Sequence, residues 1–421
     1  MTAMSATQTR NNPMRWWDYL TLNVYWFALS FMWNSMAPLL LPTLVQNVVP
    51  ESQKGGALGT LSAIGLIIAM IVQLLSGAWS DERTTRWGKR RPYIVGGTSF
   101  DVVFLLLMVF SGNYVMLVVG YALLQLSSNI AHGPYQAYIP ELVPEAKHGT
   151  VTGVKQLFEI IGIIITSLAV GRLVDQGLGG LVLAFVLIIF FLLGTMAITA
   201  LFVKEKPFDG MAETQSEHRA MQSGSPLEMI FYSRDFFLWL FSRLLILVGT
   251  NLVRNYILYF LKDVLHVENP GTEAGNLLAI LAVAIAFVVL PAGILSDRFG
   301  RKIFIVISGV LGAIGAVMMM GATSLSMVLI AGTVVGIGIG IFLTVNWAWG
   351  TDLIPVHEGG RFLGISNIAT AGAGVLAGGG GWMLDFFNAQ SPNLGYTVLF
   401  LTAAVCYVLG TVLVLAVKDT K

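Results

Sequence analysis

The sequence predicts an all-α membrane protein with twelve spanning helices in two similar six-helix bundles. Composition is the first reason: 56% of the 421 residues are hydrophobic and only 11% are charged, whereas soluble domains carry roughly 25% charged residues. The second reason is a series of long apolar runs along the whole chain. The third is a charged loop motif that occurs twice, once in each half of the chain.

Twelve apolar runs are long enough to cross a bilayer, which takes about 20 residues per helix. Pro38 and Pro42 lie inside the first run and Pro291 inside the eighth, so bends are expected there. Glycines crowd the stretch 372–381 of the eleventh run and predict close helix packing. The expected spans are 18–46, 57–79, 92–110, 114–138, 150–171, 180–203, 236–261, 273–296, 302–321, 326–350, 361–386 and 396–417.

Two loop motifs recur in the second half of the chain. Residues 77–92 (GAWSDERTTRWGKRRP) match 293–303 (GILSDRFGRKI), at an offset of 216 before a four-residue insertion and 212 after it. Residues 141–144 (ELVP) match 352–355 (DLIP) at an offset of 211. The chain is therefore predicted to be two related halves, 1–203 and 236–421, joined by a linker at 204–235. Internal repeats of this kind are typical of secondary transporters.

Basic residues indicate the orientation in the membrane. With both termini in the cytoplasm, 18 of the 24 Lys and Arg residues fall in cytoplasmic segments. The outer loops then hold Lys54, Arg172 and Lys262, while Lys155, Arg243 and Arg254 lie within spans. This asymmetry fits the positive-inside rule and predicts an integral protein of the cytoplasmic membrane. The polar start leads into a full-length span, so no cleavable signal peptide is expected.

Several classes of protein are disfavoured. The net charge is +1 with scattered basic residues, so no nucleic-acid partner is expected. The single cysteine, Cys406, forms no intrachain disulfide and supplies no metal site. Neither a phosphate-binding loop nor a clustered catalytic set is visible, so we expect no cofactor, no metal and no enzymatic activity. The expected state is a monomer in the lipid bilayer.

The two motif copies carry a family resemblance that covers essentially the whole chain. Residues 293–302 fit the G-x-x-x-D-R-x-G-R-[RK] loop of the major facilitator superfamily at every defined position. The first copy, D-x-x-T-x-R-W-G-K-R-R-P at 81–92, resembles the loop of the glycoside and sugar cation symporters and the related sucrose transporters. Sodium-coupled members of that branch carry paired aspartates in the second span and another in the fourth. Here the second span has Gln73 and the fourth has no acid, so sodium coupling at that site is not expected.

The loop motif is expected to act as a gate. Asp81 can pair with Arg90 or accept hydrogen bonds from the N-terminus of a facing helix, and Gly77 and Gly88 permit close approach and a tight turn. Such a latch holds the cytoplasmic side shut and releases when the halves rock. The alternative is a charge cluster that only sets topology. The gating set is Gly77, Asp81, Arg86, Gly88, Arg90, Gly293, Asp297, Arg298, Gly300 and Arg301.

Three ionisable residues within the spans are candidates for proton coupling, because buried charges are costly and usually functional. Lys155 and Glu159 are spaced i, i+4 in the fifth span, so an intrahelical ion pair is expected. Glu159 is then a candidate proton carrier, unless the pair is static. Asp101 lies nine residues beyond Pro92, about 14 Å along the helix, hence near mid-membrane. It is either a second coupling site or a hydrogen-bonded structural group.

The resembled fold implies a cavity lined by the first, fourth, seventh and tenth spans, and these carry polar stripes. Amides, hydroxyls and aromatic rings suit a sugar or polyol, whereas Arg254 could attract a carboxylate such as a uronate. The alternative is interhelical hydrogen bonding. The candidate substrate-binding residues are Trp33, Asn34, Gln125, Asn129, His132, Tyr135, Gln136, Asn251, Arg254, Asn255, Asn346 and Trp347.

The expected function is secondary active transport of a small polar solute, a sugar or glycoside, by proton symport with alternating access. One alternative is a proton-coupled exporter of drugs or organic solutes, although such exporters usually have a Gly-Pro motif in the fifth span and 162–171 contains no proline. An uncoupled facilitator is a further alternative. A non-transporting membrane sensor would need an appended domain, and the longest polar segment is the linker.

Overall fold

The computed structural model describes residues 15–82, 85–144, 147–205, 234–353 and 359–417. These form long helices, with no strand among the described residues. The first half comprises α1 (Trp16–Ser35), η1 (Met36–Leu40), α2 (Leu41–Val48), η2 (Glu51–Gln53), α3 (Lys54–Glu82), α4 (Arg91–Val109), α5 (Tyr114–Gln136), α6 (Tyr138–Leu142), α7 (His148–Val174) and α8 (Gly177–Phe202). The second half comprises α11 (Arg234–Asp263), α12 (Pro270–Phe299), α13 (Arg301–Met320), α14 (Leu325–Asp352), α15 (Gly359–Asn388) and α16 (Leu394–Ala416).

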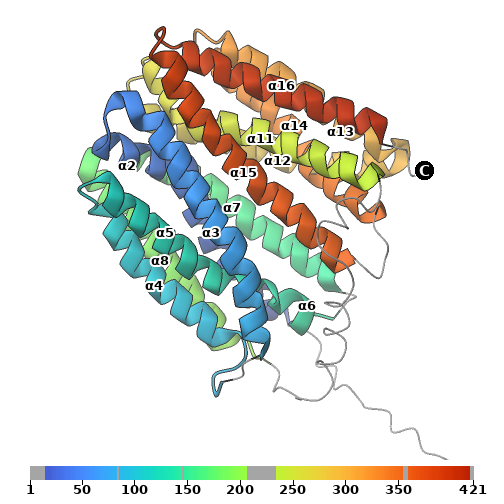
Figure 1. The fold of residues 1–421 in the computed structure, drawn as a ribbon. Helices are drawn as coiled ribbons and strands as arrows, with labels where there is room; N and C mark the ends of the chain where they lie inside the picture. The colour runs from blue at the N-terminus through green and yellow to red at the C-terminus, as the bar shows by residue number, and fades with distance from the viewer. Residues whose placement is uncertain (1–14, 83–84, 145–146, 206–233, 354–358, 418–421) are drawn as a thin grey trace, which may run out of the picture.

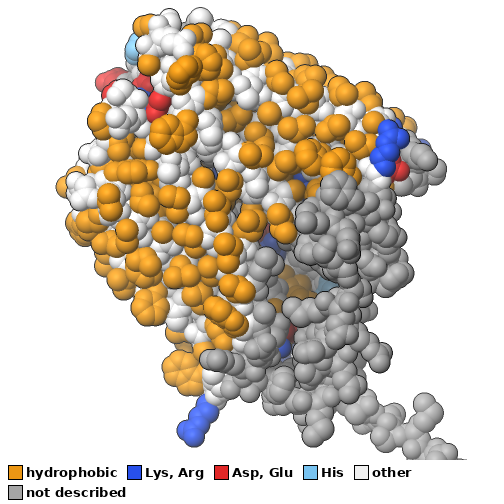
Figure 2. Space-filling view, viewed as in Figure 1, with side chains coloured by type: hydrophobic (Ala, Val, Ile, Leu, Met, Phe, Trp, Pro, Cys, Tyr) orange, Lys and Arg blue, Asp and Glu red, His pale blue; other side chains and the backbone are white. Residues whose placement is uncertain are grey.

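Eleven segments in the described part of the chain are long and apolar enough to span a membrane. The expected twelfth span corresponds to α15, which is 30 residues long but rich in glycine, and glycine contributes little hydropathy. The linker predicted at 204–235 falls mainly on 206–233, outside the described residues, so the domain boundaries remain a prediction. On the face seen in Figure 2 most side chains are apolar, and the most prominent charged groups gather toward the ends.

The first span is bent, as predicted, and the bend is a π-helical turn. Residues Met36–Leu40 form this turn between α1 and α2, with Pro38 inside it. Proline has no N–H to donate and its ring crowds the carbonyl four residues back, so an α-helix deforms around it. Pro291, in contrast, lies inside the continuous helix α12.

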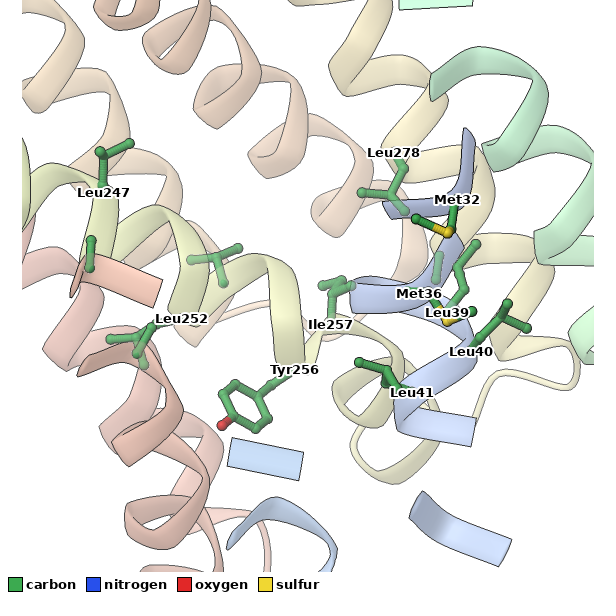
Figure 3. Packing of buried hydrophobic residues seen from close by; sticks show 14 of the residues in the cluster. Met32, Met36, Leu39, Leu40, Leu41, Leu247, Leu252, Tyr256, Ile257 and Leu278 are labelled. Atoms are coloured by element: carbon green, nitrogen blue, oxygen red, sulfur yellow. The ribbon is translucent and has the colours of Figure 1, made fainter. Parts of the chain in front are cut away.

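The helices pack as two six-helix bundles (Figure 1). In the first, α1 packs on α7 and α8, and α4 packs on α5 and α8. In the second, α11 packs on α15 and α16, and α14 packs on α12 and α13. The bundles meet where α3 lies along α15 and α7 along α12. The bent first span also contacts α11 and α12, and Figure 3 shows Ile257 near Met36 and Leu278 near Met32.

The two ends of the protein differ. The end that carries residues 85–91 and 298–302 is called the basic end, and the end with Lys54, Asp175, Asp263 and Asp385 is called the Lys54 end. In Figure 1, α6 lies at the basic end and α2 at the Lys54 end.

Glycines bring the two bundles into backbone contact near the Lys54 end. A Cβ added to Gly59 of α3 would lie 1.9 Å from the carbonyl oxygen of Gly378 in α15. A Cβ added to Gly275 of α12 would lie 2.1 Å from the carbonyl oxygen of Ser167 in α7. In the internal repeat α3 corresponds to α12, and α7 corresponds to α15. The α3–α15 crossing and the α12–α7 crossing are therefore equivalent. The close packing predicted for 372–381 is therefore confirmed.

We expect Gly59→Ala to destabilise the folded protein by about 1–3 kcal/mol, because the added methyl overpacks a backbone contact. Thermal melting in detergent measures this loss. Gly194→Ala is the matched control, since an added Cβ there meets nothing within 4 Å. Equal melting temperatures for the two variants would contradict the tight crossing.

Candidate functional site

A cavity of about 740 Å³ lies between the two bundles. Residues of α1, α3, α5 and α7 line one wall, and residues of α11 to α15 line the other. Most of its side chains are apolar. The polar side chains in the wall are Asn34, Gln73, Gln136, Thr250, Asn251, Arg254 and Thr370. Apolar walls with a few convergent polar groups are typical of a small-molecule site.

Four of the twelve predicted substrate-binding residues line this cavity: Asn34, Gln136, Asn251 and Arg254. The other eight lie behind or beside the wall. Several of them bond to helix neighbours, as when Asn129 Nδ2 donates to the Gln125 backbone carbonyl, or to the backbone, as when the Tyr135 hydroxyl donates to the Leu22 carbonyl. Those outside the wall are Trp33, Gln125, Asn129, His132, Tyr135, Asn255, Asn346 and Trp347.

The first and seventh spans are joined across the cavity by a polar contact. Arg254 Nη2 donates to Asn34 Oδ1 at 2.5 Å. Asn34 Nδ2 in turn donates to the Ser30 carbonyl at 2.8 Å, which fixes the amide with its oxygen toward the arginine. Arg254 is the one ionisable side chain in the described wall. Its charge is therefore met by a neutral amide.

A second arginine lies just behind the wall. Arg243 is 5% exposed, and its Nη2 donates to the hydroxyl of Thr370, a wall residue, at 3.1 Å. Its Nη1 donates to Asn346 Oδ1 at 2.6 Å, and Trp347 lies 5.8 Å from the guanidinium. Both predicted residues of the tenth span thus bind an arginine rather than line the wall.

Sequence reasoning did not select Arg243, Gln73 or Thr370 as site residues, and it placed Thr250 in the polar stripe of the seventh span without including it among the twelve candidates. Arg243 and Arg254 are eleven residues apart, three helical turns, so they share a face of α11. That spacing, for two cations inside one span, is the signal that would have found Arg243. The signal for Thr370 is the repeat, since at the offset of 211 it corresponds to Glu159 of the fifth span.

The predicted ion pair in the fifth span is present. Lys155 Nζ lies 3.2 Å from Glu159 Oε1, and both side chains are about a quarter exposed, at 26% and 23%. The Lys155 ammonium also lies 4.1 Å from the Trp26 ring centre. The Ser30 hydroxyl donates to the Glu159 backbone carbonyl at 2.8 Å. One helical turn further on, Ile163 lines the cavity, so the pair lies beside the cavity.

Asp101 is fully buried inside the first bundle and is absent from the cavity wall. The Ser127 hydroxyl donates to its Oδ1, while its Oδ2 has no hydrogen-bond partner among the described residues. The hydrogen bond fits the structural role considered for this residue, and the open oxygen fits a proton site. The His132 ring packs edge-on against Trp26 at 5.2 Å and bonds Gln136 at 3.0 Å.

At the basic end, Arg90 binds an acid of α6. It donates to the carboxylate of Glu141, to the Ser80 hydroxyl and to the Gly77 carbonyl. The predicted role of Asp81 lies outside the described side chains. The main-chain N–H groups of residues 89–91 donate to Glu205, which caps the N-terminus of α4. Glu205 was not predicted as part of this site.

The glycines of the motif play different roles. Gly88 has φ +115°, a conformation that residues with a Cβ rarely adopt, so the tight turn predicted there is present; Gly300 of the second copy has φ +99°. An added Cβ on Gly77 would meet nothing within 4 Å, although α5 passes close to its backbone, since a Cβ added to Gly133 would lie 3.3 Å from the Gly77 nitrogen. Gly293 has only an ordinary contact, 3.5 Å, to Thr344.

In the second copy the described contacts are made by two arginines. Arg301 lies 3.4 Å from Asp297 and donates to the Ala348 carbonyl. Arg298 lies over the Phe299 ring at 5.8 Å, and Arg86 of the first copy is exposed. All ten residues of the set remain a gating prediction.

Hydrogen bonds between the bundles cluster at the Lys54 end. Asp385, near the end of α15, accepts from the backbone N–H groups of Gly55 and Gly56 at 3.0 and 2.6 Å. Asp175, just after α7, accepts from those of Gly271 and Thr272 at 2.8 and 2.7 Å. Each carboxylate therefore sits on the positive N-terminus of a helix in the other bundle. The pair was not predicted, and it obeys the same internal symmetry as the glycine crossings.

A buried ion pair adds to this closure. Lys54 is 3% exposed and lies 2.5 Å from Asp263 of α11, and it also pairs with Glu51. The Tyr396 hydroxyl donates to the same Asp263 carboxylate. The Lys54 end is thus closed by backbone crossings, two capped helix ends and an ion pair.

We expect Asp385→Asn to favour opening of the Lys54 end. Losing the charge at a helix N-terminus costs about 0.3–1 kcal/mol, which shifts the open population up to about fivefold. The measurement is the labelling rate of a cysteine placed at Ala69 of the cavity, in a Cys406→Ser background, by an impermeant maleimide added from the Lys54 side. Glu268→Gln, an exposed acid at the same end, is the control. An unchanged rate in Asp385→Asn would contradict the latch.

Two membrane bundles that are related by internal symmetry, and that enclose a mostly apolar cavity with a few polar groups, have the architecture of a secondary transporter. The chain belongs to the MFS/sugar transport protein family, whose sequence model matches residues 54–417.

Individual relatives are more distant. A sucrose transport protein of Arabidopsis thaliana is 26% identical over 198 residues, which cover 39% of this chain and 32% of that protein. A class C tetracycline resistance protein of Escherichia coli is 31% identical over 154 residues, 36% of this chain and 38% of that protein. The chain thus matches only about a third of the length of these relatives.

Solved structures confirm the major facilitator fold. A D-xylose-proton symporter aligns with a TM-score of 0.75 at 18% identity, over 97% of this chain and 99% of that one. A nucleoside transporter aligns with a TM-score of 0.74 at 15% identity, over 96% and 100%. At these identities the likeness concerns the fold.

Proposed function

We propose that this protein is a secondary active transporter that moves a sugar or glycoside by proton symport with alternating access. The observation that carries the proposal is the central cavity, closed at the Lys54 end, with amides and hydroxyls on both walls. Such groups bond sugar hydroxyls as donors and as acceptors. The sucrose transport proteins and the D-xylose-proton symporter among its relatives support a sugar-type solute.

Substrate contact is proposed first for the four predicted residues in the wall, Asn34, Gln136, Asn251 and Arg254. Gln73, Thr250 and Thr370 join them as wall hydroxyls and amides. The eight predicted residues outside the wall would reach the solute only after a change of side-chain or helix position.

The proton carrier is proposed to be Glu159. Its carboxylate lies beside the cavity and pairs with Lys155, so protonating Glu159 would free the ammonium and alter the charge next to the bound solute. Proton binding is thereby linked to solute binding through the Lys155–Glu159 ion pair, in which Nζ and Oε1 lie 3.2 Å apart. Asp101 is the second candidate, although it lies within the first bundle and outside the wall.

The orientation remains the one proposed from the basic residues, with the basic end and both termini in the cytoplasm. The conformation described then faces the cytoplasm, since the Lys54 end is the closed one. The motif around Arg90 would latch the cytoplasmic side in the opposite conformation. We place the protein in the cytoplasmic membrane as a monomer.

A second candidate function is export of an apolar drug. The tetracycline resistance relative and the mostly apolar wall of the cavity favour it. Against it stands the absence of proline from residues 162–171, where exporters of this type usually carry a Gly-Pro motif. Uptake assays separate the two, because an exporter would move cationic drugs rather than sugars.

Proteoliposome uptake tests both the solute class and the coupling. We expect an inward proton gradient to drive accumulation of one member of a panel of radiolabelled sugars. Glu159→Gln should abolish gradient-driven accumulation, a loss of more than about tenfold, while exchange without a gradient survives. Asp101→Asn is tested separately, and Glu268→Gln, an exposed acid, is the control.

Accumulation that persists in Glu159→Gln and disappears in Asp101→Asn would move the proton site to Asp101. No uptake of any sugar by correctly folded protein would refute the sugar proposal, and the same vesicles would then be tested with cationic drugs.

A further inference from the structure

The cavity carries an unbalanced positive charge. Among its described lining residues Arg254 alone is ionisable, and its guanidinium donates a hydrogen bond to the neutral amide of Asn34. The carboxylate beside the cavity, Glu159, is matched by Lys155. A charge removed from water is costly unless a counter-charge and hydrogen bonds compensate it. The described wall supplies no such counter-charge.

Arg243 strengthens this imbalance. It is 5% exposed, it makes no ion pair with a described residue, and its Nε has no acceptor among them. Its neighbour Asn346 has a buried Nδ2 that also lacks an acceptor in the described part of the chain. Its contact to Thr370 places the guanidinium directly behind the wall. Among its described residues, the second bundle thus presents two cations and spare donors at the cavity, without an acid.

We propose that the transported solute is an anionic sugar, whose carboxylate or phosphate group binds Arg254. This inference rests on the proposed sugar transport and names the substrate class. A guanidinium has five N–H donors, and Asn34 occupies one, so a bidentate contact with an oxyanion remains open. Arg243 adds a second positive charge behind the same wall, and the amides and hydroxyls of both walls bind the sugar hydroxyls.

The alternative is that Arg254 and Asn34 only tether the two bundles. A tether would affect all solutes alike, whereas an anion site changes the ratio between anionic and neutral solutes. The test therefore compares ligands with the same ring: D-glucuronate, D-glucose 6-phosphate and D-glucose, together with D-galacturonate and D-galactose.

Binding to the purified full-length protein and uptake into proteoliposomes are measured for each ligand. We expect an anionic ligand to be preferred over its neutral counterpart by at least about tenfold, and Arg254→Gln to lower its affinity by about 10- to 100-fold, as loss of a charged hydrogen-bond partner does. The neutral sugar should change less than about threefold. Lys262→Gln removes an exposed cation from the same helix and should change neither.

A second variant keeps the tether and removes the site. Asn34→Asp places a built-in carboxylate against Arg254, so it should abolish binding of the anionic ligand while the protein folds and still binds the neutral sugar. Comparing glucuronate with glucose 6-phosphate then shows which oxyanion the site takes.

Equal binding of anionic and neutral sugars, with no change of ratio in Arg254→Gln or Asn34→Asp, would overturn the anionic class but leave sugar transport standing. Failure of every sugar, neutral or anionic, in a protein with a normal melting transition would overturn both proposals together.

Discussion

The close backbone crossings at the Lys54 end constrain everything else in this protein. Gly59 packs against the Gly378 carbonyl, and Gly275 packs against the Ser167 carbonyl, so closely that an added Cβ would clash. The bundles can therefore lie this close only because these two positions have no Cβ. Asp385 and Asp175 then reach the helix N-termini of the opposite bundle, which a wider crossing would prevent. With this end closed, the bundles enclose the central cavity between the crossings and the basic end.

Charge in the membrane interior is arranged differently in each place where it occurs. Lys155 and Glu159 neutralise each other within one helix, whereas the ion pair that joins the two bundles, Lys54 and Asp263, lies at the Lys54 end. Asp101 has one hydroxyl donor and one open oxygen. Arg254 and Arg243 have neutral acceptors and no acid among the described residues. Uncompensated charge in a bilayer is costly and usually functional. The arginines therefore mark the wall where a bound solute would contribute most to charge compensation.

The fold was predictable from the sequence because span length, the repeated loops and the basic residues each depend on local chain properties. The Lys155–Glu159 pair was predictable for the same reason, being one helical turn apart. Asp175 and Asp385 were not, because their partners are backbone N–H groups nearly a hundred or more residues away. The polar stripes predicted the spans that face the cavity better than they predicted the individual residues in its wall. An asparagine such as Asn129 hydrogen-bonds to its own helix instead.

The repeat also shows how two related bundles come to hold different chemistry. At the offset of 211, Lys155 and Glu159 of α7 correspond to Ser366 and Thr370 of α15. Where the first bundle has an ion pair, the second has hydroxyls, and Thr370 accepts from Arg243 of α11 instead. An acid at position 370 would neutralise Arg243 and remove the charge imbalance of that wall. This difference between the two copies separates two tasks, so that the proposed proton site lies in the first bundle and the proposed anion site in the second.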